Sequence, residues 1–343
     1  MNSQLAAPIS EDRPLVSIII PHRHQHSWLQ RCLLMCCQQS YSNIEIIIVD
    51  DCSEELPENH LNISDPRIRF IRTRSQIGPA GARNLGFKAS TGQFIQFLDC
   101  DDHIHSKKIE CQVQTLISNQ GHVVLSNWRS AARLFGFDFL FPTSQLPDNE
   151  ELLNETVGDS EKWFPIMCGL FSREFLAEVG PWNEGLEWNE DRDYRYRILK
   201  MKPLILRAPG NFFIYRRHNS PSRNTQFNVT PRGRDIIART NQSFIKMVER
   251  DIAQGFVSGD EVADGLRQAK QRMADLSQVQ VLGVEGKFYI LSFYSRVKVS
   301  LKTLISADAA YGMSATFGLL KSWIKSWSIY IFFKVRKFDS KRT

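Results

Sequence analysis

The sequence has no long uninterrupted apolar run, because Asp308, Lys321 and Lys325 interrupt its most apolar C-terminal stretch. A helix that spans a membrane needs about 18 or more apolar residues, so no such helix is expected. The N-terminal segment, MNSQLAAPISEDRP, carries acidic residues and lacks the apolar core of a signal peptide. We therefore expect neither a membrane span nor export.

Paired cysteine motifs are also missing. The seven cysteines are scattered, odd in number and without C-x-x-C spacing, which disfavours a disulfide framework or a cysteine zinc site. Reduced thiols in the cytoplasm fit this pattern. The formal net charge of +6 is modest and spread over 343 residues, so nucleic acid is not an expected partner.

Apolar, β-branched runs alternate with segments of helical periodicity in the first third of the chain. Strands are predicted over residues 15–20, 44–49, 67–71 and 94–98, and helices over 28–39, with Ser27 as cap, and 80–89. Farther on, helices are predicted over 175–179, 190–199 and 235–305, and a variable connection or hairpin over 120–163. This order predicts an α/β fold with a mostly parallel sheet flanked by helices.

Polar residues follow the first, second and fourth predicted strands, at positions 22–24, 50–51 and 99–102. Ligands of such sheets bind at the carboxyl ends of the strands. The side chains of Asp99 and Asp101 are expected on one face, and carboxylate oxygens suit Mg²⁺ or Mn²⁺. The alternative is that these acids only solvate a loop before a helix capped near Ser106.

Six segments follow one another in order: VSIIIP, EIIIVDDCS, DPRIRFI, GPAGARNLGFKASTGQFIQFLDCDD, CGLFSREFLAEVG and WNEDRDYRYRIL. Together they resemble the family 2 glycosyltransferases, enzymes with a Rossmann-like GT-A fold. The resemblance implies a GT-A domain over residues 14–230, an N-terminal extension over 1–13 and a helical C-terminal region over 231–343.

The resemblance also implies roles for individual residues. It implies that Asp51 accepts hydrogen bonds from the base, that Arg83 faces the base or the diphosphate, and that Asp101 and Asp102 hold ribose and metal, with Asp99 in support. His218 is a further candidate for the Mn²⁺ or Mg²⁺ ion, although a histidine in a polar loop is as often only solvated. The expected nucleotide-sugar contacts are Pro21, His22, Arg23, Asp51, Gly78, Arg83, Asn84, Asp99, Asp101 and Gly169.

Several of these residues have a purely structural alternative. Arg83 could form a surface ion pair, and Asn84 could lie on the polar face of a helix. Gly78 could only shape a turn, and Gly169 could be a packing glycine. A zinc site made by the alternating His22, His24 and His26 is not expected, because Pro21 ends the strand that such spacing requires.

Glu190 and Asp191 meet at the start of a predicted helix, whose positive end stabilises carboxylates. Neighbouring helical side chains point about 100° apart, so only one of them can face the sugar. The resemblance favours Asp191 as the base that deprotonates the acceptor and Glu190 as the structural member, and it implies transfer with inversion. The alternative is that both acids only stabilise the start of the helix.

The sequence disfavours two related enzyme classes. A sugar nucleotidyltransferase needs a glycine-rich loop with a lysine after the first strand, and PHRHQHSW has no glycine. A dinucleotide oxidoreductase would need G-x-G-x-x-G at that turn. A non-catalytic nucleotide-sugar-binding scaffold is the rival from another class, and the intact acids at the expected positions argue against it.

The C-terminal tail is basic and amphipathic, with Leu320, Trp323, Ile324, Trp327 and Ile331 spaced three or four residues apart. A helix over residues 315–338 could lie on an anionic membrane surface or pack on the protein's own core. The first alternative predicts a cytoplasmic enzyme, peripheral on the inner face of the membrane. There it would use a UDP-sugar and a glycan or lipid-linked acceptor in cell-surface polysaccharide synthesis.

Overall fold

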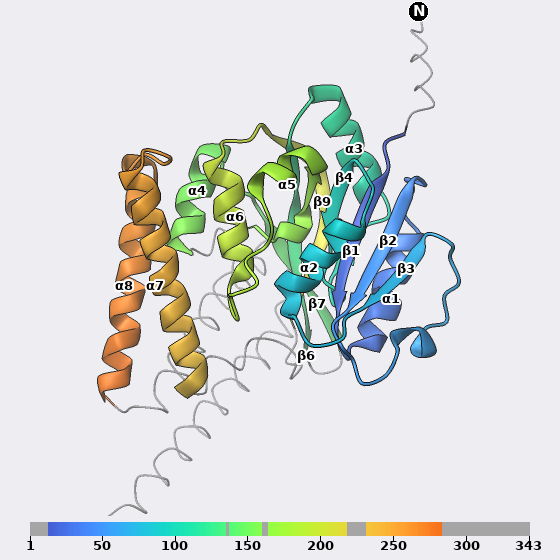
Figure 1. Cartoon of the computed structure of the whole chain (residues 1–343). Coiled ribbons are helices and arrows are strands. Elements are labelled where there is room, and N and C mark those ends of the chain that lie inside the picture. The colour runs from blue at the N-terminus through green and yellow to red at the C-terminus, as the bar shows by residue number, and fades with distance from the viewer. Residues whose placement is uncertain (1–12, 135–136, 160–163, 218–230, 283–343) are drawn as a thin grey trace, which may run out of the picture. The chain divides into compact units, whose positions relative to one another are not determined.

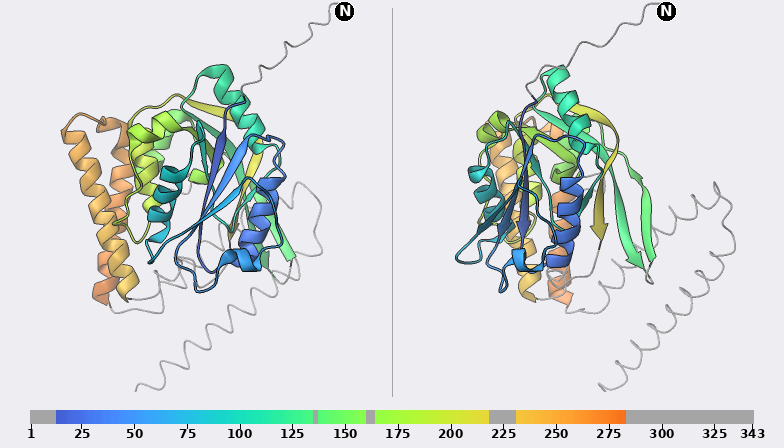
Figure 2. Two further views of the ribbon diagram at one scale, coloured as in Figure 1. Left: turned by 45° about the vertical axis from the view of Figure 1, so that its right-hand side comes forward. Right: turned by 90° about the vertical axis from the view of Figure 1, so that its right-hand side faces the viewer.

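The computed structural model describes residues 13–134, 137–159, 164–217 and 231–282. Within these ranges the strands form one nine-stranded sheet with helices on both faces (Figures 1 and 2). The strand order is β3-β2-β1-β4-β8-β6-β9-β5, and β7 pairs with β6 beside this path. The predicted α/β fold is therefore confirmed.

The first four strands are parallel and close to their predicted positions. They are β1 (Val16–His22), β2 (Ile44–Asp50), β3 (Ile68–Arg72) and β4 (Phe94–Phe97). Helix α1 (His26–Cys37) begins at His26, with Gln25 as its N-cap residue and no side-chain capping bond. The prediction that Ser27 caps this helix was therefore wrong.

Helix α2 (Gly78–Ala89) lies very close to the sheet. A Cβ atom on Gly86 would lie 2.4 Å from the Ile19 side chain, so only glycine permits this approach. Ala82 of α2 packs on Ile47 and Val49, whereas the alternate β2 residue Ile48 belongs to the core on the other face. This contact sets the distance from the sheet of the helix that carries three of the predicted site residues, Gly78, Arg83 and Asn84.

The C-terminal half of the sheet is mixed. Strand β8 (Gly169–Ser172) is antiparallel to both β4 and β6 (Val123–Leu134), and β6 is parallel to β9 (Ile205–Arg217). The short β5 (His103–Ile104) is antiparallel to β9. Strands β6 and β7 (Phe137–Ser144) form the hairpin predicted as one alternative for residues 120–163. The sheet is thus parallel on one side and mixed on the other.

Further helices cover the sheet: α3 (Lys108–Asn119), α4 (Asn149–Gly158), α5 (Arg173–Val179) and α6 (Glu190–Lys200). The predicted C-terminal helical region begins with α7 (Pro231–Ala253) and α8 (Ala263–Leu282). Asp251 of α7 accepts hydrogen bonds from Tyr196 and Lys200 of α6, at 3.0 and 2.8 Å. Helix α7 is thereby fixed to the helix that begins with the two predicted catalytic acids.

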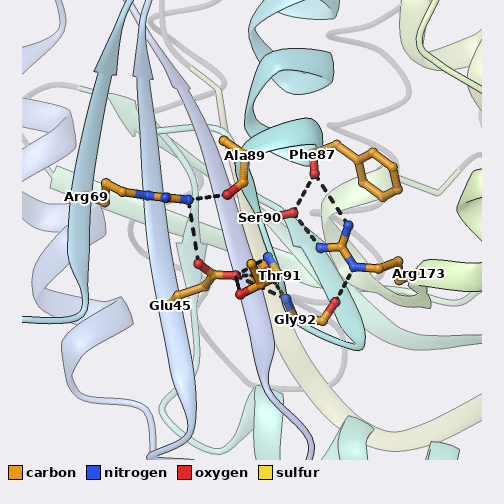
Figure 3. A network of polar contacts seen from close by, with 9 residues as sticks. Glu45, Arg69, Phe87, Ala89, Ser90, Thr91, Gly92 and Arg173 are labelled. Atoms are coloured by element: carbon orange, nitrogen blue, oxygen red, sulfur yellow. Dashed lines mark hydrogen bonds and ion pairs between the residues drawn. The ribbon is translucent and has the colours of Figure 1, made fainter.

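A polar network fixes the turn between α2 and β4, at the end of the sheet away from the predicted site (Figure 3). The Glu45 carboxylate accepts hydrogen bonds from the backbone N–H groups of Thr91 and Gly92, at 2.6 and 3.1 Å. Arg173, at the start of α5, donates to the carbonyl groups of Phe87 and Gly92. The C-terminal end of α2 is therefore tied to both β2 and α5.

Within the described part of the chain, the residues as far as Leu276 belong to one compact unit. The predicted tail helix over residues 315–338 and His218 both lie outside the described residues. Among the helices of the described part, none combines the length and the apolar character that a membrane span requires.

Candidate active site

The carboxyl ends of β1, β2 and β4 lie side by side, and each is followed by predicted site residues. His22, the last residue of β1, is paired in register with Asp50, the last residue of β2. Strand β4 pairs with the other edge of β1 and leads into residues 99–102. The predicted gathering of polar residues at this edge is therefore confirmed.

His22 and Asp50 hold the ends of the first two strands together. His22 Nδ1 lies 3.1 Å from Asp50 Oδ1, and both side chains are buried. Burial lowers the pKa of His22 to about 4, although the hydrogen bond with Asp50 acts in the opposite direction. Pro21 precedes this pair in β1, and Arg23 follows it as an exposed side chain at the same edge.

Asp51 binds the loop that leads into α2. Its carboxylate accepts hydrogen bonds from the backbone N–H groups of Ile77 and Gly78, at 2.7 and 2.9 Å, and from the Thr73 hydroxyl at 3.3 Å. Gly78 has a φ of +76°, a backbone conformation that favours glycine. Asp51 thus anchors this loop, and its contact with a base stays a prediction.

The three acids after β4 converge in a turn. One oxygen from each of Asp99, Asp101 and Asp102 lies within 4.8 Å of those of the other two. The strand ends at Phe97, and the Asp102 N–H donates to the Asp99 carbonyl at 3.1 Å. A turn, and not strand alternation, therefore brings them together. Three carboxylates at this spacing are a donor set that fits Mg²⁺ or Mn²⁺.

Arg83 joins this acidic cluster to the start of α6. Its Nη2 lies 2.7 Å from Asp99 Oδ1, and its Nη1 lies 3.0 Å from Glu190 Oε1. Burial lowers the pKa of Arg83, but the charges of Asp99 and Glu190 outweigh it and raise that pKa above its usual value. The guanidinium also lies over the ring of Trp182, 4.5 Å from its centroid. Arg83 is therefore a buried bridge, not a surface ion pair.

Asn84 holds the segment between α5 and α6. Its side-chain amide donates to the Trp182 carbonyl at 2.9 Å and accepts from the Trp182 N–H at 2.7 Å. These two bonds place the Trp182 ring beneath Arg83. No local pattern in the sequence points to Trp182, which lies about a hundred residues from both of its partners.

Glu190 and Asp191 point in different directions, as helical geometry predicts. Glu190 is paired with Arg83, and its side chain is 10% exposed. Asp191 is 31% exposed and accepts a hydrogen bond from Arg195 Nη1 at 2.9 Å. Asp191 is therefore the more accessible of the two acids.

Strand β9 brings a residue to the acids that was not singled out in the sequence. The backbone N–H of Arg216 donates to Asp102 Oδ1 at 2.9 Å. The guanidinium of Arg216 lies over Trp28 of α1, 4.7 Å from the ring centroid, and its Nη2 is 2.6 Å from His103 Nε2. The sequence pointed to this segment only through His218, the predicted metal ligand two residues after Arg216.

Gly169 lies at the start of β8, where neighbouring side chains fill the space beside it. A Cβ atom there would lie 2.6 Å from the Phe171 ring and 3.1 Å from Leu125. Packing within the sheet accounts for this glycine, and its contact with a donor sugar stays a prediction. The preceding carbonyl groups of Met167 and Cys168 accept hydrogen bonds from Gln96 and Gln112, at 2.9 and 2.8 Å.

Lys108 lies in the middle of this buried network. It is fully buried, and its ammonium nitrogen is within hydrogen-bond distance of Gln96 Oε1, Gln112 Oε1 and the Gly169 carbonyl oxygen. Burial lowers the pKa of Lys108 to about 7. These hydrogen bonds hold the segment that leads into β8. The charge state of Lys108 therefore affects the stability of the site.

We expect the stability of the protein to depend on pH through Lys108. Between about pH 7 and pH 10 the unfolded chain holds a proton on this lysine that the folded chain has lost, so the free energy of unfolding rises with pH. Lys108 should contribute up to about 1.4 kcal/mol per pH unit to this rise in the free energy of unfolding. The Lys108→Met protein should lack this contribution. Urea unfolding at pH 7, 8 and 9 measures the difference in slope.

The Lys108→Met protein should be less stable throughout, because three acceptors lose their donor, so only the slope is decisive. Lys107→Met, at the exposed neighbouring lysine, is the matched control. Parallel curves for the wild type and Lys108→Met would contradict the expectation.

Several known proteins are similar to this chain. A protein described as an uncharacterized glycosyltransferase of Haemophilus influenzae is 38% identical over 117 residues, which are 33% of this chain and 46% of that protein. Glycosyltransferase GlyG of Streptococcus pneumoniae is 26% identical over 65% of this chain and 77% of its own. An Escherichia coli enzyme, UDP-Glc:alpha-D-GlcNAc-diphosphoundecaprenol beta-1,3-glucosyltransferase WfgD, is 33% identical over 34% of this chain and 47% of its own.

Among solved structures, that of S. aureus TarS 1-349 in complex with UDP-GlcNAc is similar, with 15% identity and a TM-score of 0.49. The match covers 80% of this chain and 87% of that one. The model of the family described as "Glycosyl transferase family 2" matches residues 17–218, more than half of the 343 residues and the range that holds both acidic groups. The chain belongs to glycosyl transferase family 2.

Proposed function

We propose that this glycosyltransferase moves a sugar from a nucleoside-diphosphate donor, favouring UDP-sugars, to a hydroxyl group of a glycan or lipid-linked acceptor. The observation that carries the proposal is the link that Arg83 makes between Asp99 of the acidic turn and Glu190 at the start of α6. This link joins the acidic turn, a donor set for a cation, to Glu190, and the next residue of that helix is the more accessible acid, Asp191.

The acidic turn is suited to the diphosphate end of the donor. Asp99, Asp101 and Asp102 would hold Mn²⁺ or Mg²⁺, which when bound neutralises charge on the departing diphosphate. Arg83 keeps Asp99 in place, and its positive charge offsets the mutual repulsion of the acids. A direct contact of Arg83 with the diphosphate would require one of its two ion pairs to open.

Asp191 is suited to act as the general base. The acceptor hydroxyl loses its proton to Asp191 as its oxygen forms a bond with the anomeric carbon. The bond between that carbon and the diphosphate oxygen breaks in the same step, so the configuration at the anomeric carbon is inverted. Glu190 holds α6 to Arg83, which positions Asp191 one residue farther along the helix.

The chemistry of the relatives supports the acceptor class. WfgD is, by its name, a glucosyltransferase that uses UDP-Glc and a diphosphoundecaprenol-linked sugar, and a further relative is a succinoglycan biosynthesis protein of Rhizobium meliloti. We therefore propose a role in cell-surface polysaccharide synthesis. The peripheral membrane contact proposed for residues 315–338 would bring the enzyme to a lipid-linked acceptor.

Donor binding can be tested by thermal shift with UDP-, GDP- and dTDP-sugars, each with and without Mn²⁺. A donor at about a hundred times its Kd should add about 2.7 kcal/mol to the free energy of unfolding, and we expect this for UDP-sugars with Mn²⁺. Release of the nucleoside diphosphate measures activity in the same samples. A protein that is stabilised but releases none above background, with any acceptor tried, would be a binding scaffold and not an enzyme.

A further inference from the structure

Three side chains outside the candidate active site converge at the loops that follow β1 and β2. His26 is the first residue of α1, Glu55 lies in the loop after β2, and His60 ends the short helix η1 (Pro57–His60). One possible ligand atom of each lies within 4.8 Å of those of the other two. His60 Nε2 is 2.5 Å from Glu55 Oε2, and the rings of His26 and His60 stack with centroids 4.3 Å apart.

A buried ring nitrogen in this group lacks a partner. Nδ1 of His26 is buried and makes no hydrogen bond within the part of the chain that the structure describes. A buried polar atom without a partner is unfavourable, so a bound cation or water is expected near it. The stacked rings also place two imidazoles in contact, with Glu55 as the acid beside them.

A third histidine lies next to this group. The His22 ring is 5.2 Å from that of His26, and its Nδ1 is bound to Asp50. Because the carboxylate can only accept, Nδ1 is the donor and Nε2 is left as an acceptor, which is buried and has no partner among the described residues. A carboxylate that orients a histidine in this way is common behind metal ligands.

The donor set differs in kind from that of the acidic turn. Two imidazoles and one carboxylate suit Zn²⁺ and neighbouring transition metals, whereas Mg²⁺ and Mn²⁺ favour oxygen ligands alone. Zinc binds histidine nitrogen and carboxylate oxygen atoms at about 2.0–2.2 Å. The ligand atoms around one zinc ion must therefore lie roughly 3.3 Å from one another. The Glu55 and His60 side chains are 66% and 38% exposed, so both can shift by the small distance required.

We propose that His26, Glu55 and His60 bind one Zn²⁺-class transition-metal ion, with water as the fourth ligand. The ion would join the start of α1 to the loop after β2, next to the His22–Asp50 pair. Metal binding here is independent of the transferase activity proposed above, and its failure would leave that proposal unchanged.

Isothermal titration calorimetry of zinc binding tests the proposal. The titration uses the full chain, first stripped of metal and kept reduced. We expect one Zn²⁺ site that His60→Ala and Glu55→Gln each weaken at least tenfold. Both residues are exposed, so neither substitution removes a core contact. His24→Asn is the matched control. His24 is an exposed histidine of the loop between β1 and α1, and asparagine tolerates its φ of +56°. This control should bind zinc like the wild type.

Two further measurements separate this site from other metal-binding groups. Mn²⁺ binding, followed by electron paramagnetic resonance, should persist in His60→Ala and be lost in Asp102→Asn. Co²⁺ in place of Zn²⁺ should give a visible spectrum without thiolate-to-metal charge transfer. Unchanged zinc affinity in His60→Ala and Glu55→Gln would overturn the proposal. Zinc binding that depends on Asp102 or on a cysteine would do the same.

Discussion

Replacing Asp191 with asparagine should lower kcat by about 10²- to 10⁴-fold and change donor affinity little, because an amide cannot accept the proton of the acceptor hydroxyl. Asp191 is the more exposed acid of its pair, at 31% against 10% for Glu190. Its hydrogen bond from Arg195 can persist with an amide oxygen, so the fold should be retained. Steady-state kinetics with saturating acceptor, together with donor titrations, measure the two effects separately.

Glu190→Gln is the matched control for this variant. Its loss of kcat should be smaller, whereas its melting temperature should fall more, because the buried Arg83 loses one of its two charge partners. If Asp191→Asn kept nearly full kcat while Glu190→Gln lost it, the roles of the two acids would have to be exchanged.

Replacing Asp102 with asparagine should abolish Mn²⁺-dependent transfer and leave the fold intact. The amide cannot supply the ionised oxygen that the cation needs from this turn. Asp102 is only 1% exposed, but the bond that its Oδ1 accepts from the Arg216 N–H at 2.9 Å can be made by an amide oxygen as well. Donor turnover against Mn²⁺ concentration measures the activity, and circular dichroism with thermal melting checks the fold.

Asp101→Asn should behave in the same way if these two acids share the ion. Full turnover in Asp102→Asn, with metal still required, would transfer the ligand role to Asp99 or Asp101. Turnover that is independent of metal in the wild type would contradict the proposed cation site altogether.

The strands that the sequence predicted well are those whose signal is local. Strands β1 and β2 lie between helices on both faces, so most of their residues are apolar and the runs are easy to recognise. The strands that it missed depend on distant partners. Strand β8 has only four residues, and β9 contains Pro209 and Gly210, which usually indicate a turn. Their pairing with β4 and β6 makes them strands.

For the site, the amino-acid sequence alone determined that polar residues follow the first, second and fourth predicted strands, because the strand period is a local property of the chain. Only the tertiary structure decided their partners. Arg83 is bound to Glu190, Asp51 is bound to the loop before α2, and the ring of His26 stacks on that of His60. Such contacts join segments that are far apart in the chain, and packing of the helices and loops on the sheet selects them. No local pattern of residues encodes that packing.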